Sequence, residues 1–177
     1  MTYDKSFEDR AYDGVIPQPI NSPTLKKILL TPEYVLERLE EGGDPIQLSI
    51  DKWEKIKEAY NFIAHEGFKS FYYGDIYHLS GANTCALCII AKKEYEKECG
   101  SQKNQGDKCI KCILSEIEPC YDINSVYSNI TYLLGYRLPE YYKDQPDLKI
   151  RGLRTDEEFS LLGKNIDIMI ERLRSLQ

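Results

Sequence analysis

Six cysteines lie close together in the sequence, between Cys85 and Cys120, and their spacing suits metal binding. Four of them form two C-x-x-C pairs, Cys85 with Cys88 and Cys109 with Cys112, and twenty residues separate the pairs. Zinc prefers four soft donors at the corners of a tetrahedron, with Zn–S distances of about 2.3 Å. Two cysteines three positions apart, on a tight turn or at a helix start, can direct both sulfurs at one ion. We therefore predict that these two pairs bind one structural zinc ion.

The other two cysteines are expected to play different roles. Cys120 follows Pro119 and is the alternative fourth ligand if one member of a pair points away from the metal. Cys99 falls at the end of an expected helix, where we predict an ordinary thiol. Lys111 stands between the cysteines of the second pair. We expect its charge to offset the negative charge of a zinc tetrathiolate.

Two other cysteine chemistries stay open, because an iron–sulfur cluster and redox-active or bridged dithiols also use such spacings. The redox interpretation is less favoured, since no βαβ pattern surrounds either pair. Residues 1–14 are polar and acidic and lack the apolar segment of a secretory signal. No apolar run approaches the roughly 20 residues that span a bilayer, so no membrane partner is expected. We therefore expect a cytoplasmic protein whose cysteines are reduced.

The net charge of −6 argues against non-specific binding of nucleic acid, which needs clustered lysine and arginine. Residues 91–112 hold six lysines against four acids, a small local excess that a solvated surface explains as well. Tyrosine is abundant, with fourteen tyrosines against five phenylalanines. Tyrosines gather at half-wet contact surfaces. Tyr72, Tyr73 and Tyr77 precede the first cysteine pair and are our candidate partner-binding residues, with a helix–helix core as the alternative.

Catalysis is the less favoured interpretation. A tetrathiolate leaves zinc no open coordination position for a substrate or water. The chain has only two histidines, His65 and His78, and both are typical of ordinary surface or half-buried positions. No Ser/His/Asp arrangement, phosphate-binding loop or G-x-G-x-x-G motif occurs.

The elements that must position the cysteines are expected to be helices. Thr31 as N-cap and Pro32 at the first position predict a helix that ends at Gly42-Gly43. Apolar residues at the 3.6 period predict a second helix near 49–65. Further helices are expected over 85–98, over 109–118, and from Asn124 or Ser125 to 134. A capping box at Thr155 predicts the last helix.

Residues 68–80 are aromatic and β-branched around a Gly-Asp pair and predict at most a short β-hairpin. With 42% hydrophobic residues, a chain of 177 residues can bury a proper core. We therefore expect a mainly α, small single domain built around a zinc knuckle of four cysteines. Residues 1–30 are expected to be an extended N-terminal arm, and residues 31–177 a helical domain that contains the zinc-binding segment 85–120.

The run Ser-Ile-Asp-Lys-Trp-Glu-Lys at residues 49–55, followed by Cys-Ala-Leu-Cys, a second C-x-x-C and one more cysteine, resembles a family of small bacteriophage and prophage proteins. The similarity covers about residues 48–123. This chain departs from the family pattern because Ile113 replaces a proline, the intervening loop is longer, and Cys99 is extra. The resemblance implies a phage or prophage origin, the cytoplasm of the host bacterium and a modular zinc centre, but no reaction.

These observations predict a non-catalytic, zinc-stabilised binding protein. Its expected role is that of a phage-encoded accessory protein that binds and neutralises or modulates a host protein, such as a defence component, or a small ligand. The alternatives are a nucleotide-binding or nucleotide-cleaving enzyme, and a specific nucleic-acid-binding zinc protein that uses the lysines of 91–112.

Overall fold

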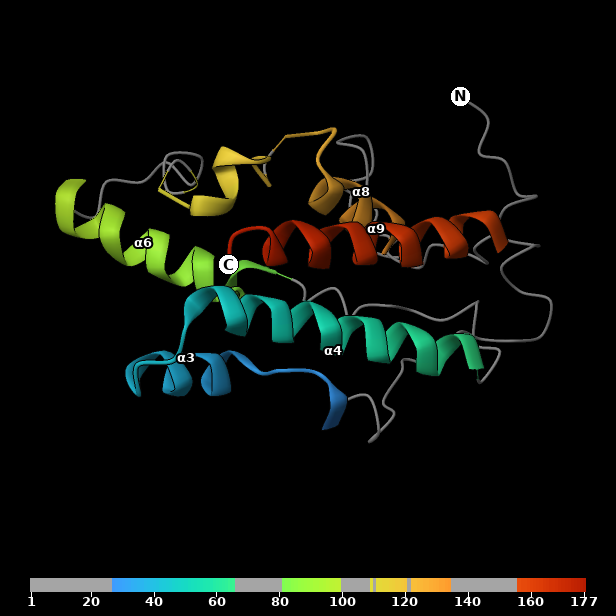
Figure 1. Cartoon of the computed structure of the whole chain (residues 1–177), viewed down its shortest axis with the longest axis horizontal. Coiled ribbons are helices and arrows are strands. Elements are labelled where there is room, and N and C mark those ends of the chain that lie inside the picture. Colours follow the sequence, from blue (N-terminus) through green and yellow to red (C-terminus); the bar gives the residue numbers. More distant parts are fainter. Residues whose placement is uncertain (1–26, 66–80, 100–108, 110, 121, 135–155) are drawn as a thin grey trace, which may run out of the picture.

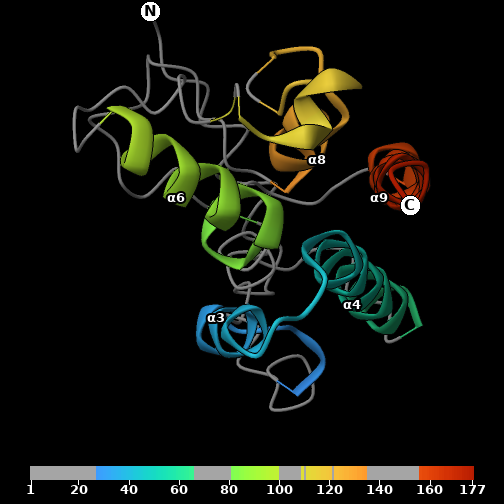
Figure 2. The same cartoon turned by 60° about the vertical axis from the view of Figure 1, so that its left-hand side comes forward.

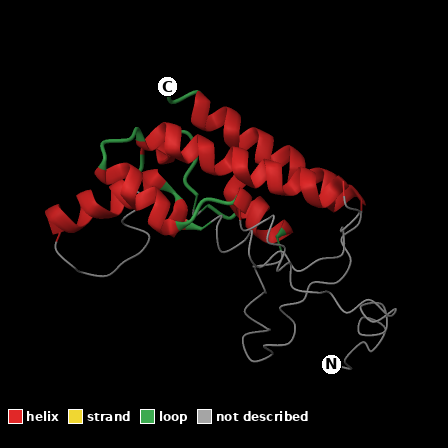
Figure 3. Ribbon diagram, turned by 90° about the horizontal axis from the view of Figure 1, so that it is seen from below, coloured by secondary structure: helices red, strands yellow, loops and turns green. Residues whose placement is uncertain are grey.

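A computed structural model of the chain describes residues 27–65, 81–99, 109, 111–120, 122–134 and 156–177. Its elements are α3 (Pro32–Glu40), α4 (Pro45–His65), η1 (Ala82–Thr84), α6 (Ala86–Cys99), η2 (Ile113–Glu116), α8 (Val126–Leu133) and α9 (Asp156–Arg174), where η denotes a 3-10 helix. The ranges described contain helices and loops but no strand (Figure 3). The prediction of a mainly α protein is confirmed. The hairpin predicted over 68–80, and residues 1–26 of the predicted arm, lie outside the described residues.

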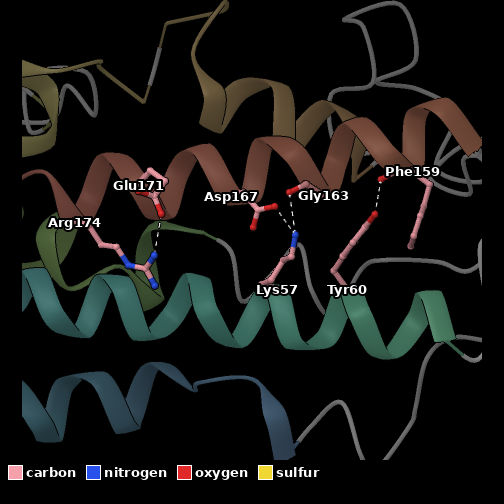
Figure 4. Close-up of polar contacts among 7 residues, drawn as sticks. All are labelled: Lys57, Tyr60, Phe159, Gly163, Asp167, Glu171 and Arg174. Atoms are coloured by element: carbon pink, nitrogen blue, oxygen red, sulfur yellow. Dashed lines mark hydrogen bonds and ion pairs between the residues drawn. The ribbon is translucent and has the colours of Figure 1, made fainter.

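The longest two helices, α4 and α9, run side by side in opposite directions (Figures 1 and 4). The Tyr60 hydroxyl donates to the carbonyl oxygen of Phe159 at 3.0 Å, near the end of α4 and the start of α9. Towards the other end of the pair, a guanidinium nitrogen of Arg174 lies 2.8 Å from a Glu54 carboxylate oxygen. Residue numbers therefore fall along α4 as they rise along α9, which defines an antiparallel pair.

Helix α4 lies at the centre of the fold, because α9 packs against one side of it and α6 against another. Helix α3 contacts α6 and lies on the side of α4 away from α9 (Figures 1 and 2). Helix α8 packs against α9 and closes the core from the side away from α4. The main core cluster includes Ile50, Trp53, Ile56 and Ala59 of α4, Val126, Ile130 and Leu133 of α8, and Phe159, Leu162, Ile166, Met169, Ile170 and Leu173 of α9. A smaller cluster of Val35, Leu48 and Ala86 joins α3, α4 and α6. Among the described helices, none has the length and apolar character needed to cross a membrane.

Side-chain caps explain where several helices begin. The Thr31 side chain accepts a hydrogen bond from the backbone N–H of Tyr34 at 3.3 Å, as predicted for this N-cap. Helix α4 begins at Pro45, earlier than the predicted start near residue 49. The reason is that the Asp44 carboxylate accepts from the N–H of Ile46 at 2.9 Å, while proline suits the first helical position.

The helix predicted over 109–118 is wrong in extent and type. In the described part of this range, Cys109 is helical, Lys111 lies in a turn, and the short 3-10 helix η2, Ile113–Glu116, follows. The turn is closed by the N–H of Cys112, which donates to the carbonyl of Cys109 at 3.1 Å. Pro119 follows and, without a backbone N–H, cannot extend a helix. The spacing of the second cysteine pair therefore reflects a turn.

Candidate metal centre

Three separate segments bring five cysteines to one region beside the core. Cys85 and Cys88 lie at the start of α6, Cys109 and Cys112 lie in the turn before η2, and Cys120 lies between η2 and α8. None of these five forms a disulfide. They line two adjoining hollows of about 270 and 170 Å³; Cys88, Cys109 and Cys120 line both. The four predicted ligands and the predicted alternative are thus brought together.

The first pair is positioned by the start of α6. The carbonyl of Cys85 accepts the first helical hydrogen bond, from the N–H of Ile89 at 3.0 Å, so Cys85 occupies the N-cap position. Its own N–H donates to the carbonyl of Ala82 in η1 at 3.2 Å. Cys88 then lies in the first turn of the helix. The positive end of the helix dipole stabilises thiolates at such positions.

The second pair is positioned by a turn that continues into η2. Besides the bond that closes the turn, Ser115 donates to the carbonyl of Cys112 twice, from its N–H at 2.8 Å and from its hydroxyl at 2.6 Å. The Cys112 thiol is buried, and Cys109 is half-buried. The backbone of this pair is therefore fixed on one side by the turn and on the other by the start of η2.

Cys120 is held by contacts of its own segment with α8 and α9. The Ser125 hydroxyl, whose oxygen also caps α8, donates to the carbonyl of Cys120 at 3.1 Å. Two residues before Cys120, the Glu118 carboxylate accepts from the N–H of Val126 at 2.7 Å and forms an ion pair with Arg172 of α9. These bonds tie the last cysteine segment to the helical core.

Hydrogen bonds and burial affect the five thiols differently. The Cys88 thiol is hydrogen-bonded to Cys112 and to Cys85, which raises the pKa of Cys88. The same contacts lower the pKa of Cys112 and lower the pKa of Cys85 to about 5, against the opposing effect of burial. Burial raises the pKa of Cys109 and raises that of Cys120 to about 12. Cys88 therefore contacts both Cys85 and Cys112, and Cys109 and Cys120 line the same hollows as Cys88.

Two polar residues of α4 complete the region, and the sequence analysis missed both. The hydroxyl oxygen of Ser49 accepts from the N–H of Leu87 at 3.3 Å and lies 3.9 Å from the sulfur of Cys85. Lys52 is only 2% exposed, lines the smaller hollow, and donates from Nζ to the carbonyl of Gly81 at 2.8 Å. Its position in the sequence could have predicted this burial, because Lys52 lies four residues from Leu48 and from Ile56, on the same face of the helix as these apolar residues.

The other residues singled out from the sequence lie elsewhere. Lys111, predicted to offset the charge of the centre, is exposed, and its Nζ lies 2.7 Å from a Glu98 carboxylate oxygen. The backbone of Cys99 is eleven residues beyond that of Cys88 in the same helix, about 16 Å along its axis at 1.5 Å per residue. His65 is exposed at the end of α4. Tyr72, Tyr73, Tyr77 and His78 lie outside the described residues.

The donor set of this region fits a soft metal ion. Thiolates are the ligands that zinc and iron–sulfur clusters select, and four of the five cysteines would complete a tetrahedral zinc site. In the part of the chain described, no group of three or more His, Cys, Asp or Glu side chains already has the geometry to hold a metal ion. Instead, the Cys88 thiol is hydrogen-bonded to Cys85 and to Cys112. Ligation would therefore require deprotonation and rearrangement of the cysteine side chains.

A comparison of the chain with protein-family models, curated proteins and solved structures found no match. The resemblance to the phage and prophage family therefore stays a prediction from the sequence.

Proposed function

We propose that this chain is a non-catalytic binding protein whose fold is stabilised by one zinc ion held by cysteine thiolates. The observation that carries the proposal is that five thiols from three separate segments line two adjoining hollows, and three of these thiols line both. Cysteines that serve only as small apolar core residues are not expected to cluster from positions as distant as 85 and 120. Their convergence beside the buried cation of Lys52 supports a charged thiolate centre.

A structural role for the metal follows from which elements it would join. The helical core of α4, α8 and α9 is closed by apolar side chains. The turn before η2 and the segment after it, by contrast, have only short elements. In η2, Leu114 is the buried residue that packs on the core. A zinc ion bound by both C-x-x-C pairs would link that turn to α6. All four coordination positions would then be filled by protein, which leaves none for a substrate.

The test is the metal content of the purified full-length chain, together with its thermal unfolding before and after treatment with a strong chelator. We expect one zinc ion per chain and a lower unfolding temperature after chelation. Binding stabilises the folded state by RT ln(1 + [Zn]/Kd), about 4 kcal/mol when free zinc is about 1,000 times the Kd. A chain without stoichiometric metal would contradict the proposal. Iron with visible absorbance would instead support the iron–sulfur alternative.

The binding role is supported by apolar side chains beside the cysteines. Ile113, Ile117 and Ile123 are exposed, Ile123 by 70%, and they lie on the segments immediately before and after Cys120. A metal ion would fix the segments that carry them. We propose that they contribute to a surface for a host protein. The role of Tyr72, Tyr73 and Tyr77 in partner binding stays a prediction from the sequence.

This part of the proposal is tested by affinity capture from bacterial lysate with matched variants. The double variant Ile117→Ser/Ile123→Ser is compared with Ile168→Ser, which changes an equally apolar, exposed residue of α9. We expect a captured protein to be lost with the double variant and kept with the α9 variant. Equal capture by both would exclude the isoleucines from the binding surface.

A further inference from the structure

We infer that Lys52 is the counter-ion of the cysteine centre, a positioning residue whose ammonium group offsets the charge of the zinc-bound thiolates and strengthens metal binding. This inference depends on the proposed zinc site and adds to it a residue from outside the cysteine segment. A Zn²⁺ ion with four thiolates has a net charge of −2, and a nearby ammonium group reduces the net charge of the region to −1.

The position of Lys52 is the first support. It lies in the middle of α4, is 2% exposed, and lines the same hollow as Cys85, Cys88, Cys109 and Cys120. Lysine is almost never fully buried unless its charge is compensated. A buried ammonium group among four thiols is therefore explained if those thiols become thiolates.

The hydrogen bonding of Lys52 is the second support. Its Nζ donates to the carbonyl of Gly81 at 2.8 Å, and Gly81 is the N-cap residue of η1, the element that leads into Cys85. An ammonium group has three N–H donors, of which this bond uses one. The bond also fixes the ammonium group beside the first cysteine pair.

The charge expected of a zinc-bound centre also favours this position. A metal-bound tetrathiolate would supply more negative charge at the same place than unligated thiols do. Metal binding and the charge of Lys52 therefore favour one another.

Another role for Lys52 is purely structural, with the side chain acting only as an anchor for the Gly81 carbonyl. The two roles differ in their dependence on metal. A counter-ion matters when the thiolates are present, so its loss should mainly weaken the zinc-bound state. An anchor would matter equally with and without zinc. Replacing a buried charge by an apolar side chain of similar size is often neutral or stabilising when no opposite charge is left behind.

The experiment measures zinc affinity of the full chain by competition with a chromophoric chelator, after metal removal and reloading. The variants are Lys52→Met, Lys52→Arg and, as a matched control, Lys57→Met. Lys57 lies on the same helix, but its Nζ pairs with Asp167 of α9 at 2.6 Å (Figure 4). We expect Lys52→Met to raise the Kd for zinc about 10- to 100-fold, the usual effect of losing a residue that supports metal ligands. Lys52→Arg, which keeps the charge, should recover most of the affinity, and Lys57→Met should leave it unchanged.

Two further readouts separate the outcomes. The sulfur-to-cobalt charge-transfer bands of the Co²⁺-loaded protein should shift in Lys52→Met but not in Lys57→Met. The unfolding temperature of the metal-free protein should be no lower in Lys52→Met than in the unmodified chain. An unchanged Kd in Lys52→Met, or an equal loss of stability with and without zinc, would overturn the inference while leaving the zinc site intact. Failure of the unmodified chain to bind zinc or cobalt would instead overturn the proposed function.

Discussion

Gly163 of α9 faces Tyr60 of α4 so closely that a Cβ at residue 163 would lie 2.6 Å from the Tyr60 hydroxyl oxygen. The same Cβ would lie 2.7 Å from the ring carbon Cζ. The tyrosine ring cannot easily move, because it stacks on Phe159 with ring centroids 4.5 Å apart and its hydroxyl donates to the Phe159 carbonyl (Figure 4). The absence of a side chain at residue 163 therefore lets the two helices approach at this position.

This contact predicts that Gly163→Ala destabilises the protein, although alanine is the better helix former. Overpacking a well-filled interface costs about 1–3 kcal/mol, whereas the helix propensity of alanine contributes about 1 kcal/mol in the opposite direction. We expect a net loss on the order of 1 kcal/mol in chemical denaturation. The control is the same substitution in a Tyr60→Ala background, where the overlap is gone and Gly163→Ala should stabilise. Equal effects in both backgrounds would show that Tyr60 is not responsible.

Tyr60 also predicts a dependence of stability on alkaline pH. Burial, with a smaller contribution from the charge of Asp167, raises the pKa of Tyr60. In the unfolded chain its pKa is about 10. The contribution of Tyr60 to stability is therefore fully present below that value and is lost as the pH rises through the higher pKa of the folded state.

The measurement is the free energy of unfolding of the unmodified chain and of Tyr60→Phe, from about pH 8 to about pH 11. Tyr60→Phe should be the less stable protein at the lower pH, because it loses the hydrogen bond to Phe159. The difference between the two proteins should shrink as the pH rises. A constant difference across this range would contradict the assignment.

Single cysteine substitutions should divide the cysteines into ligands and non-ligands. Cys109→Ser should lose the metal, because a serine hydroxyl is a poor replacement for a thiolate on zinc. Cys99→Ser should keep one metal ion per chain, since its backbone lies far along α6 from Cys88. Metal content by elemental analysis is the readout, and loss of zinc from Cys99→Ser would contradict this division.

Substitution of Cys120 decides whether this cysteine is a metal ligand. Its thiol lines both hollows together with Cys88 and Cys109, so it is near enough to compete for a coordination position. With the two C-x-x-C pairs as ligands, Cys120→Ser should keep zinc and the Co²⁺ spectrum of a tetrathiolate. If Cys120→Ser loses a sulfur-to-cobalt band and Cys109→Ser keeps it, Cys120 is the fourth ligand instead.

Local signals in the sequence were sufficient for much of the helical framework. The caps at Thr31 and Ser125, the helix from the first cysteine pair, and the apolar stripe of α9 all have their counterparts in the structure. Each depends on neighbouring residues only, as helix propensity, capping and amphipathic period do. The helix predicted over 109–118 does not continue past Cys109, because a C-x-x-C spacing suits a turn as well as a helix.

Burial on α4 could not be predicted in the same way. The apolar period indicated a stripe through Ile50, Trp53 and Ile56, and these residues are buried as expected. Ser49 and Lys52 are buried as well, because α4 has α9 on one side and α6 on another. How many neighbours a helix has depends on contacts between distant parts of the chain, and its own sequence does not define it. Because the burial of Lys52 could not be read from the sequence, Lys111, which stands between two cysteines, was predicted as the cation of the centre.

The antiparallel pairing of α4 and α9 has a consequence for the protein during its synthesis. Phe159 follows Tyr60 by 99 residues, so a ribosome needs about 5–20 s to add α9 after α4 has been made. During that interval the face of α4 that α9 will cover is exposed to water on the nascent chain. All five clustered cysteines are synthesised before α9, so they are available while the core is still open. The cysteine region can therefore assemble, and bind the proposed metal ion, before α9 packs on α4.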